Sequence, residues 1–171
     1  MEITLSGTDS VSTELAQIYK RHVKTVYRVC FTYMKNAADT EDAVSDTFVK
    51  MLRAFNSRRR FDSAEHEKAW LIRAAINVCK DNLKSRRHSN VSLELLEESV
   101  PAPERENHDG VLQAVLALPE KYKTVVYLYY YEGYNSAEIA AFLKKPKSTV
   151  RNHLHEAREV LRKELAEEEL P

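Results

Sequence analysis

Apolar side chains recur every three or four residues through the first part of the chain, which is the spacing of amphipathic helices. A first stripe of this kind extends from Leu15 to Tyr33. A second helix is expected to begin near Asp39, with Val44, Phe48, Met51 or Leu52, and Phe55 on its buried side. A third helix follows the sequence Asp62-Ser63-Ala64-Glu65, which resembles a capping box, and continues to Lys84.

The third helix has two unlike sides when its residues are placed at 100° intervals. One broad side is apolar, from Leu71 to Leu83, whereas the other gathers Trp70, Arg73, Asn77, Lys80 and Lys84. Such a face can pair with phosphates, bond to base edges and stack on an unpaired base. Composition supports equally well the alternative that Trp70 packs under the preceding loop and that the cations only face solvent.

The exposed side of the second helix is acidic, with Asp42, Ser45 and Asp46 one turn apart. Carboxylates near a helix start commonly do no more than favour the helix dipole and face water. The spacing by itself leaves these residues with that simple interpretation, or with a role in binding a partner.

The last third of the chain predicts a helix-turn-helix unit. Val111 to Leu116 forms one short helix, Pro119 opens another, and six of the nine tyrosines, between Tyr122 and Tyr134, supply its core and core rim. Gly133 ends that helix, and Asn135 with Glu138 forms the capping box of the next one.

The final helix of this unit is predicted to be capped by Ser148 and to turn Val150, Leu154, Ala157 and Leu161 inward. Its outward side, where major-groove readers sit, carries a polar set of six residues: Lys147, Ser148, Arg151, Asn152, His155 and Glu156. Arginine can bond to guanine, asparagine to adenine, and glutamate can accept from cytosine.

Breakers and charge divide the chain in the same way. None of the five prolines precedes Pro101, and the Ser-, Glu- and Pro-containing stretch 89–109 is expected to be a flexible acidic linker with one helical turn at 93–97. Residues 1–88 carry a net charge of +5, the linker −5, residues 110–163 +4 and the tail after them −4. We therefore expect an all-α protein with two small helical domains, 1–88 and 110–171.

Several classes of protein are excluded or disfavoured. The 171 residues, 43% of them apolar and 30% charged, are typical of a globular chain, and no apolar run is long enough for a membrane span or arranged as a signal peptide. A cytoplasmic location is expected. The two cysteines, Cys30 and Cys79, predict free buried thiols. No catalytic motif, cofactor-binding loop or metal-ligand spacing is present, so neither an enzyme nor a bound cofactor or metal is expected.

Three sequence blocks, in order, resemble the extracytoplasmic-function (ECF) group of bacterial RNA polymerase sigma factors. The first is DTEDAVSDTFVKMLRAF, which is similar to the family's polymerase-docking helix. The second is FDSAEHEKAWLIRAAINVCKDNLKSRR, which resembles the segment that recognises and melts the minus-ten promoter element. The third, LPEKYKTVVYLYYYEGYNSAEIAAFLKKPKSTVRNHLHEAREVLRKEL, resembles the helix-turn-helix that binds the minus-35 element.

The resemblance implies a role for each candidate face. Asp42, Ser45 and Asp46 take positions that contact the clamp coiled-coil of the largest subunit of core RNA polymerase, with Ser45 where the family often has Gln. Asn77 takes the position that binds a flipped minus-ten base. In the last helix Ser148 and Glu156 stand where the family commonly has Gly and Arg, so the promoter sequence that is read is expected to differ from that of relatives.

The expected partners are core RNA polymerase, promoter DNA and, as for many relatives, a membrane-anchored anti-sigma factor, while no membrane segment of its own is expected. Two alternatives use fewer of these features. A stand-alone DNA-binding regulator leaves the acidic face of the second helix and the Asn77 face unexplained, and a helical adaptor has no need of either basic face.

Overall fold

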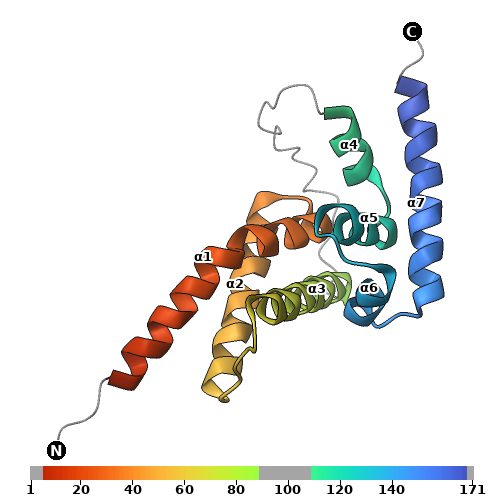
Figure 1. Ribbon diagram of the computed structural model, residues 1–171. Coiled ribbons are helices and arrows are strands. Elements are labelled where there is room, and N and C mark those ends of the chain that lie inside the picture. The colour runs from red at the N-terminus through yellow and green to blue at the C-terminus, as the bar shows by residue number, and fades with distance from the viewer. Residues whose placement is uncertain (1–5, 89–108, 169–171) are drawn as a thin grey trace, which may run out of the picture.

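The computed structural model describes residues 6–88 and 109–168, which fold into helices alone, without strands in those ranges. The first three are α1 (Ser6–Met34), α2 (Ala37–Asn56) and α3 (Ala64–His88). The second group contains α4 (Asp109–Ala117), α5 (Glu120–Val126), the π-helical turn η2 (Tyr127–Tyr131), α6 (Ser136–Leu143) and α7 (Lys147–Glu168) (Figure 1). The expected all-α class is confirmed. The linker lies outside the described residues apart from Asp109, and so does its expected helical turn.

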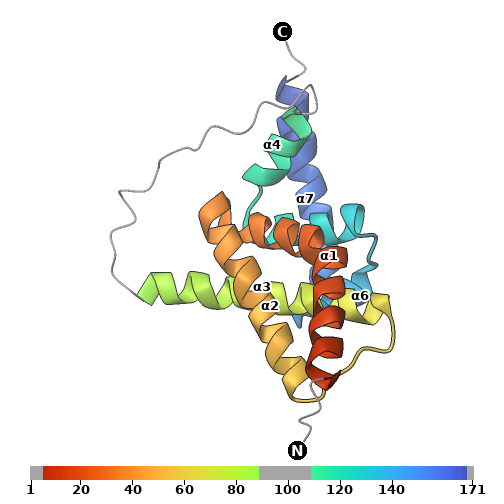
Figure 2. The same ribbon diagram turned by 90° about the vertical axis from the view of Figure 1, so that its left-hand side faces the viewer.

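Helices α1, α2 and α3 pack against one another, with α2 crossing α3 (Figure 2). The apolar spacing allowed either of two neighbouring residues to face the core at two positions, Ile18 or Tyr19 and Met51 or Leu52. Ile18 and Met51 are buried, whereas Tyr19 and Leu52 are exposed. Burying a side chain of this size contributes about 1.5–3 kcal/mol, so these stripes hold the bundle together. Both cysteines are free and buried, as expected.

Helix α2 begins two residues before the predicted start, because its cap is Asn36 and not Asp39. The Asn36 side chain accepts a 2.9 Å hydrogen bond from the Asp39 amide, which satisfies one of the unpaired amides of the first turn. The Asp39 carboxylate instead accepts from the Arg86 guanidinium at 2.6 Å, which ties the start of α2 to the end of α3. This ion pair holds the pKa of Asp39 below its usual value.

A buried carboxylate joins α3 to α1. Glu67 in the first turn of α3 lies 2.6 Å from the His22 ring and accepts from the Arg21 guanidinium at 3.0 Å. The start of this helix is capped by Ser63, whose hydroxyl accepts from the His66 amide. The predicted capping-box segment therefore does begin a helix, with Ser63 as its cap.

The second group of helices contains the predicted helix-turn-helix in α6 and α7. The capping box of Asn135 and Glu138 is present at the start of α6, and Lys144 ends this helix in the left-handed conformation. One prediction was wrong: α7 begins at Lys147, so Ser148 lies inside its first turn and does not precede it as a cap. The inward residues Val150, Leu154 and Ala157 are buried as predicted.

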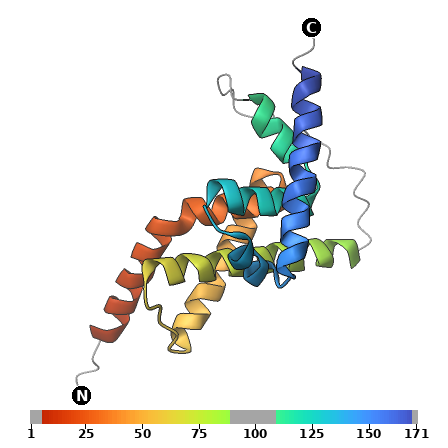
Figure 3. The same ribbon diagram turned by 45° about the vertical axis from the view of Figure 1, so that its right-hand side comes forward.

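The two groups of helices share one hydrophobic core. Val125, Leu128, Ile139, Phe142 and Leu143 belong to the same buried cluster as the apolar side of α3. Helix α5 contacts α1, and α6 contacts α3, beside part of which it lies in two views of the ribbon (Figures 1 and 3). The sequence predicted two separate modules and gave no sign of this contact.

Lys123 of α5 is fully buried beside the end of α1, an unusual position for a cation. Its amino group has no hydrogen-bond partner within the part of the chain that the structure describes. Burial, reinforced by the nearby charge of Lys35 and opposed by Glu120, lowers the pKa of Lys123 from 10.5 to about 8. Desolvation of this ammonium therefore opposes the packing of α5 on α1 at neutral pH.

We predict that Lys123→Met raises the free energy of unfolding at pH 7 by about 1–3 kcal/mol, because the side chain keeps its volume and the buried charge is removed. The advantage should shrink as the pH rises from 8 toward 10. In that range Lys123 keeps its proton in the unfolded chain but has lost it in the folded chain. The cost of burying the Lys123 charge therefore disappears from the wild-type protein as the pH rises. Urea unfolding at several pH values measures this, and a difference that grows with pH would contradict it.

Candidate functional site

The polar side of α3 is assembled as the sequence predicted. Arg73 and Lys84 are exposed, and Asn77 and Lys80 are half-buried one helical turn apart. Trp70 is different, because its indole is half-buried and packs 5.7 Å from the Phe61 ring of the preceding loop. The main contact of Trp70 is therefore with the preceding loop, as in the alternative interpretation of this residue.

The polar side of α3 is not open to solvent along its whole length, since α6 lies beside it. The Arg73 guanidinium sits 5.9 Å from the centre of the Phe142 ring of α6. The pKa of Lys80 is lowered, first by burial and then by the charge of Lys145, in the turn after α6. Asn77 lies between these two contacts, on the same face of α3.

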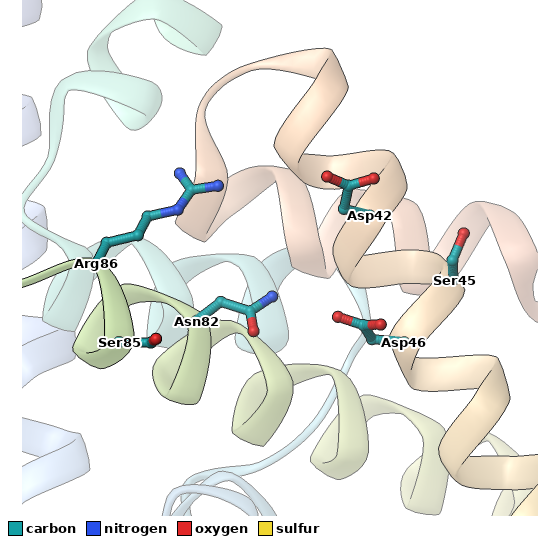
Figure 4. Close-up of a pocket in the computed structure, with 6 residues that line it drawn as sticks. All are labelled: Asp42, Ser45, Asp46, Asn82, Ser85 and Arg86. Carbon is teal, nitrogen blue, oxygen red and sulfur yellow. The ribbon is translucent and has the colours of Figure 1, made fainter. Parts of the chain in front are cut away.

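The acidic face of α2 borders a polar groove. Asp42, Ser45 and Asp46 are exposed and line a hollow of about 430 Å³ together with Asn82, Ser85 and Arg86 from the last turns of α3. Figure 4 shows the three α2 residues on one side of this hollow and the three α3 residues on the other, with the Asp46 and Asn82 side chains pointing toward each other. Arg86 also binds Asp39 at the start of α2, so this ion pair links the two walls of the groove.

The face of α2 continues beyond the acidic residues as an apolar stripe that the sequence analysis did not single out. Val49 and Leu52 follow Ser45 and Asp46 at helical spacing and are among the few large apolar side chains left exposed, at 43% and 44%. Val49 lies on the side of the helix opposite Met51, and Leu52 lies next to Val49 on that side, so the helical spacing already contained this signal. An acidic half and an apolar half together form one continuous surface, which is typical of a protein-binding helix.

The outward side of α7 carries the predicted polar set, and all six residues are exposed. Glu156 has a partner that the sequence analysis missed, since the Tyr122 hydroxyl of α5 donates a 2.6 Å hydrogen bond to its carboxylate. The ring of Tyr122 also meets His153 edge to face at 5.7 Å. Burial, more than the nearby Lys145, lowers the pKa of His153.

Residues 6–88 and 109–168 contain neither a cluster of metal ligands nor a membrane-spanning helix. No three His, Cys, Asp or Glu side chains gather there as the ligands of a metal ion do. No helix in the same ranges combines the length and apolar character needed to cross a membrane.

Comparison with known proteins identifies the family. Residues 18–89 match the family described as Sigma-70 region 2, and residues 108–161 match Sigma-70, region 4. The ECF RNA polymerase sigma factor SigL of Mycobacterium tuberculosis is 30% identical over 172 residues, which is 95% of this chain and 96% of SigL. The chain belongs to the ECF RNA polymerase sigma factors. It is accordingly an alternative sigma factor that directs transcription initiation.

Other relatives of this sigma factor agree in sequence and fold. The ECF RNA polymerase sigma factor SigW of Bacillus subtilis is 28% identical over 93% of this chain and 91% of its own length. The structure of the sigma factor RpoE from Bartonella quintana, solved in complex with the anti-sigma factor NepR, superimposes with a TM-score of 0.72 at 20% identity. It covers 92% of this chain and 97% of RpoE. CnrH, solved with the cytosolic domain of CnrY, has a TM-score of 0.60.

We predict that Trp70→Ala destabilises this sigma factor by about 1–3 kcal/mol, because the substitution removes a half-buried indole from its packing on Phe61. Lys84→Ala, an exposed position on the same helix, serves as the control and should change the free energy of unfolding by less than about 0.5 kcal/mol. Urea unfolding measures both values. Equal stability of the two variants would show that the packing of Trp70 on Phe61 does not stabilise the fold.

Proposed function

We propose that this sigma factor docks on core RNA polymerase through α2, holds the unpaired minus-ten strand on the polar side of α3, and reads the minus-35 duplex with α7. The observation that carries the proposal is the presence of three distinct polar surfaces on three helices, in the order of the two matched sigma regions. A stand-alone regulator would need α7 alone.

The docking surface is the α2 stripe of Asp42, Ser45, Asp46, Val49 and Leu52. Its partner is the clamp coiled-coil of the largest polymerase subunit. The carboxylates orient the encounter with a basic partner, and the apolar half supplies burial. The groove shared with Asn82 and Ser85 offers further hydrogen-bonding groups beside the acidic half.

The minus-ten surface centres on Asn77, whose amide can both donate to and accept from a base edge. Arg73, Lys80 and Lys84 supply positive charge along the same face for the phosphates. The loop that packs on Trp70 adds positive charge at one end of this face, through the three exposed arginines Arg58, Arg59 and Arg60. Flipping a base out of the duplex costs a few kcal/mol, which these contacts offset.

The minus-35 surface is the exposed side of α7. Lys147 and Ser148 lie at the start of the helix, where they can reach the DNA backbone. Arg151, Asn152, His155 and Glu156 then face the major groove. Because Tyr122 already binds one oxygen of Glu156, this carboxylate is held in place with its other oxygen available to a base.

Regulation by a membrane-anchored anti-sigma factor completes the proposal. RpoE, whose fold this chain shares, was solved in complex with the anti-sigma factor NepR, and CnrH was solved in complex with the cytosolic domain of CnrY. An anti-sigma factor bound to this chain would have to compete for one of the three surfaces.

The minus-ten assignment predicts that Asn77→Ala reduces run-off transcription at least tenfold while the affinity for core polymerase is unchanged, because the amide contacts DNA only. Asp81→Ala, an exposed residue on the same helix, is the control. Run-off transcription and core pull-down are measured on the same preparations. Undiminished transcript from the Asn77 variant would exclude the base-binding role.

The docking assignment predicts the opposite pattern for Asp46→Lys, namely loss of core binding. Reversing an exposed charge at the centre of a complementary interface costs about 1–3 kcal/mol of binding free energy, or roughly tenfold to hundredfold in affinity. Glu164→Lys makes the same charge change at an exposed position on α7. If both variants bind core equally well, the Asp46 carboxylate serves only to solvate its helix.

A further inference from the structure

The polar side of α3 has its own intramolecular partner, the C-terminal group of helices. Arg73 meets the Phe142 ring, Lys80 lies beside the turn after α6, and Asn77 is half-buried between them. A DNA strand that reached Asn77 would occupy the space that α6 fills. In this conformation the two polar surfaces of the chain cannot both bind a promoter.

One buried carboxylate holds this contact together. Glu132, which directly follows the π-helical turn η2, has only 5% of its side chain exposed and lies 2.8 Å from the Lys68 amino group of α3. The Tyr127 hydroxyl donates a 2.6 Å hydrogen bond to the other carboxylate oxygen. The same Lys68 ammonium sits 5.6 Å from the centre of the Tyr134 ring. A buried ion pair of this kind stabilises the contact only while both partners are in place.

A second contact between the two groups involves the last residue of η2, next to Glu132: the Arg28 guanidinium of α1 sits 4.8 Å from the centre of the Tyr131 ring. The π-helical turn is therefore held to α1 and to α3 at once. Segments of π-helix are uncommon in proteins and are frequent at functional sites.

The same contact also contains groups that oppose it. Lys123 is buried without a hydrogen-bond partner in the described ranges. The positive charges of Lys144 and Lys145 face Lys80, and each disfavours the charged form of that lysine. Opening the contact hydrates Lys123 and separates the like charges. Because these groups destabilise the closed state, a binding partner that favours the open state can shift the equilibrium toward it.

We propose that this sigma factor inhibits itself: the Lys68–Glu132–Tyr127 cluster latches the C-terminal helices over the minus-ten face, and the latch must open before that face binds DNA. The inference rests on the proposed role of Asn77. It assigns to Lys68 and Glu132 a function that neither docking nor base reading requires.

The first arm of the test measures opening without DNA. Donor and acceptor dyes are attached to Ser57→Cys in the first group and Lys163→Cys in the second, both at exposed positions, while the native cysteines are buried. Lys68→Glu places two carboxylates together and should lower the energy transfer between the dyes. The charge swap, Lys68→Glu with Glu132→Lys, should restore it. Glu159→Lys, in an exposed pair within α7, should leave it unchanged.

The second arm measures binding of a fluorescent, random-sequence, single-stranded oligodeoxynucleotide to the free protein. Lys68→Glu should raise the affinity at least threefold, although the added negative charge by itself weakens binding to phosphates. The swap should return the affinity to the wild-type value. Circular dichroism of each variant separates opening from unfolding of the helices.

Three results would overturn the latch: unchanged energy transfer in Lys68→Glu, failure of the swap to restore it in a folded protein, or opening without a gain in oligonucleotide affinity. These results are separate from failure of the proposed function, which is detected by run-off transcription with the Asn77 variant. A chain that opens and gains affinity equally with and without Asn77 would keep the latch and reject the base-binding role.

Discussion

The structure depends on the burial of one helix, α3, on two sides. Its apolar side, which includes Leu71, Ile72, Ala75, Ile76 and Cys79, is almost completely excluded from water by α1 and α2. This packing fixes the rotation of the helix about its axis, and with it the direction in which Asn77 and its neighbouring cations point. The proposed DNA surface and the contact with α6 both follow from that single orientation, since they use the same opposite side.

The polar side of α3 cannot contact α6 and the proposed DNA strand at the same time. This mutual exclusion links the fold to the proposed regulation. When α6 packs against α3, the shared hydrophobic core extends from α3 into the helix-turn-helix. When a strand of DNA occupies the same face, the two groups of helices must separate. In the proposed order of events, core polymerase binds the α2 stripe first and then draws the two proposed DNA surfaces apart.

The sequence predicted the elements well because apolar spacing is a local property. The inward residues of α2, α3 and α7 were correctly identified, as were Gly133 and the capping box of Asn135 with Glu138. Helix starts were harder to predict: α2 begins before Asp39 and is capped by Asn36, and Ser148 lies within α7. The contact between Lys68 and Glu132 joins residues on opposite sides of the linker. Neither periodicity nor charge counts contain that information, and a glutamate after a tyrosine-rich helix is typical of an exposed surface.

The account is tested most directly by the distance between the two groups of helices in the wild-type chain before and after core RNA polymerase is added. With dyes at positions 57 and 163, the free protein should show efficient energy transfer and the polymerase-bound protein a clear loss of it, without any change in helix content. Equal transfer in the free and bound states would contradict the account, because the minus-ten face would then remain covered in the complex that must use it.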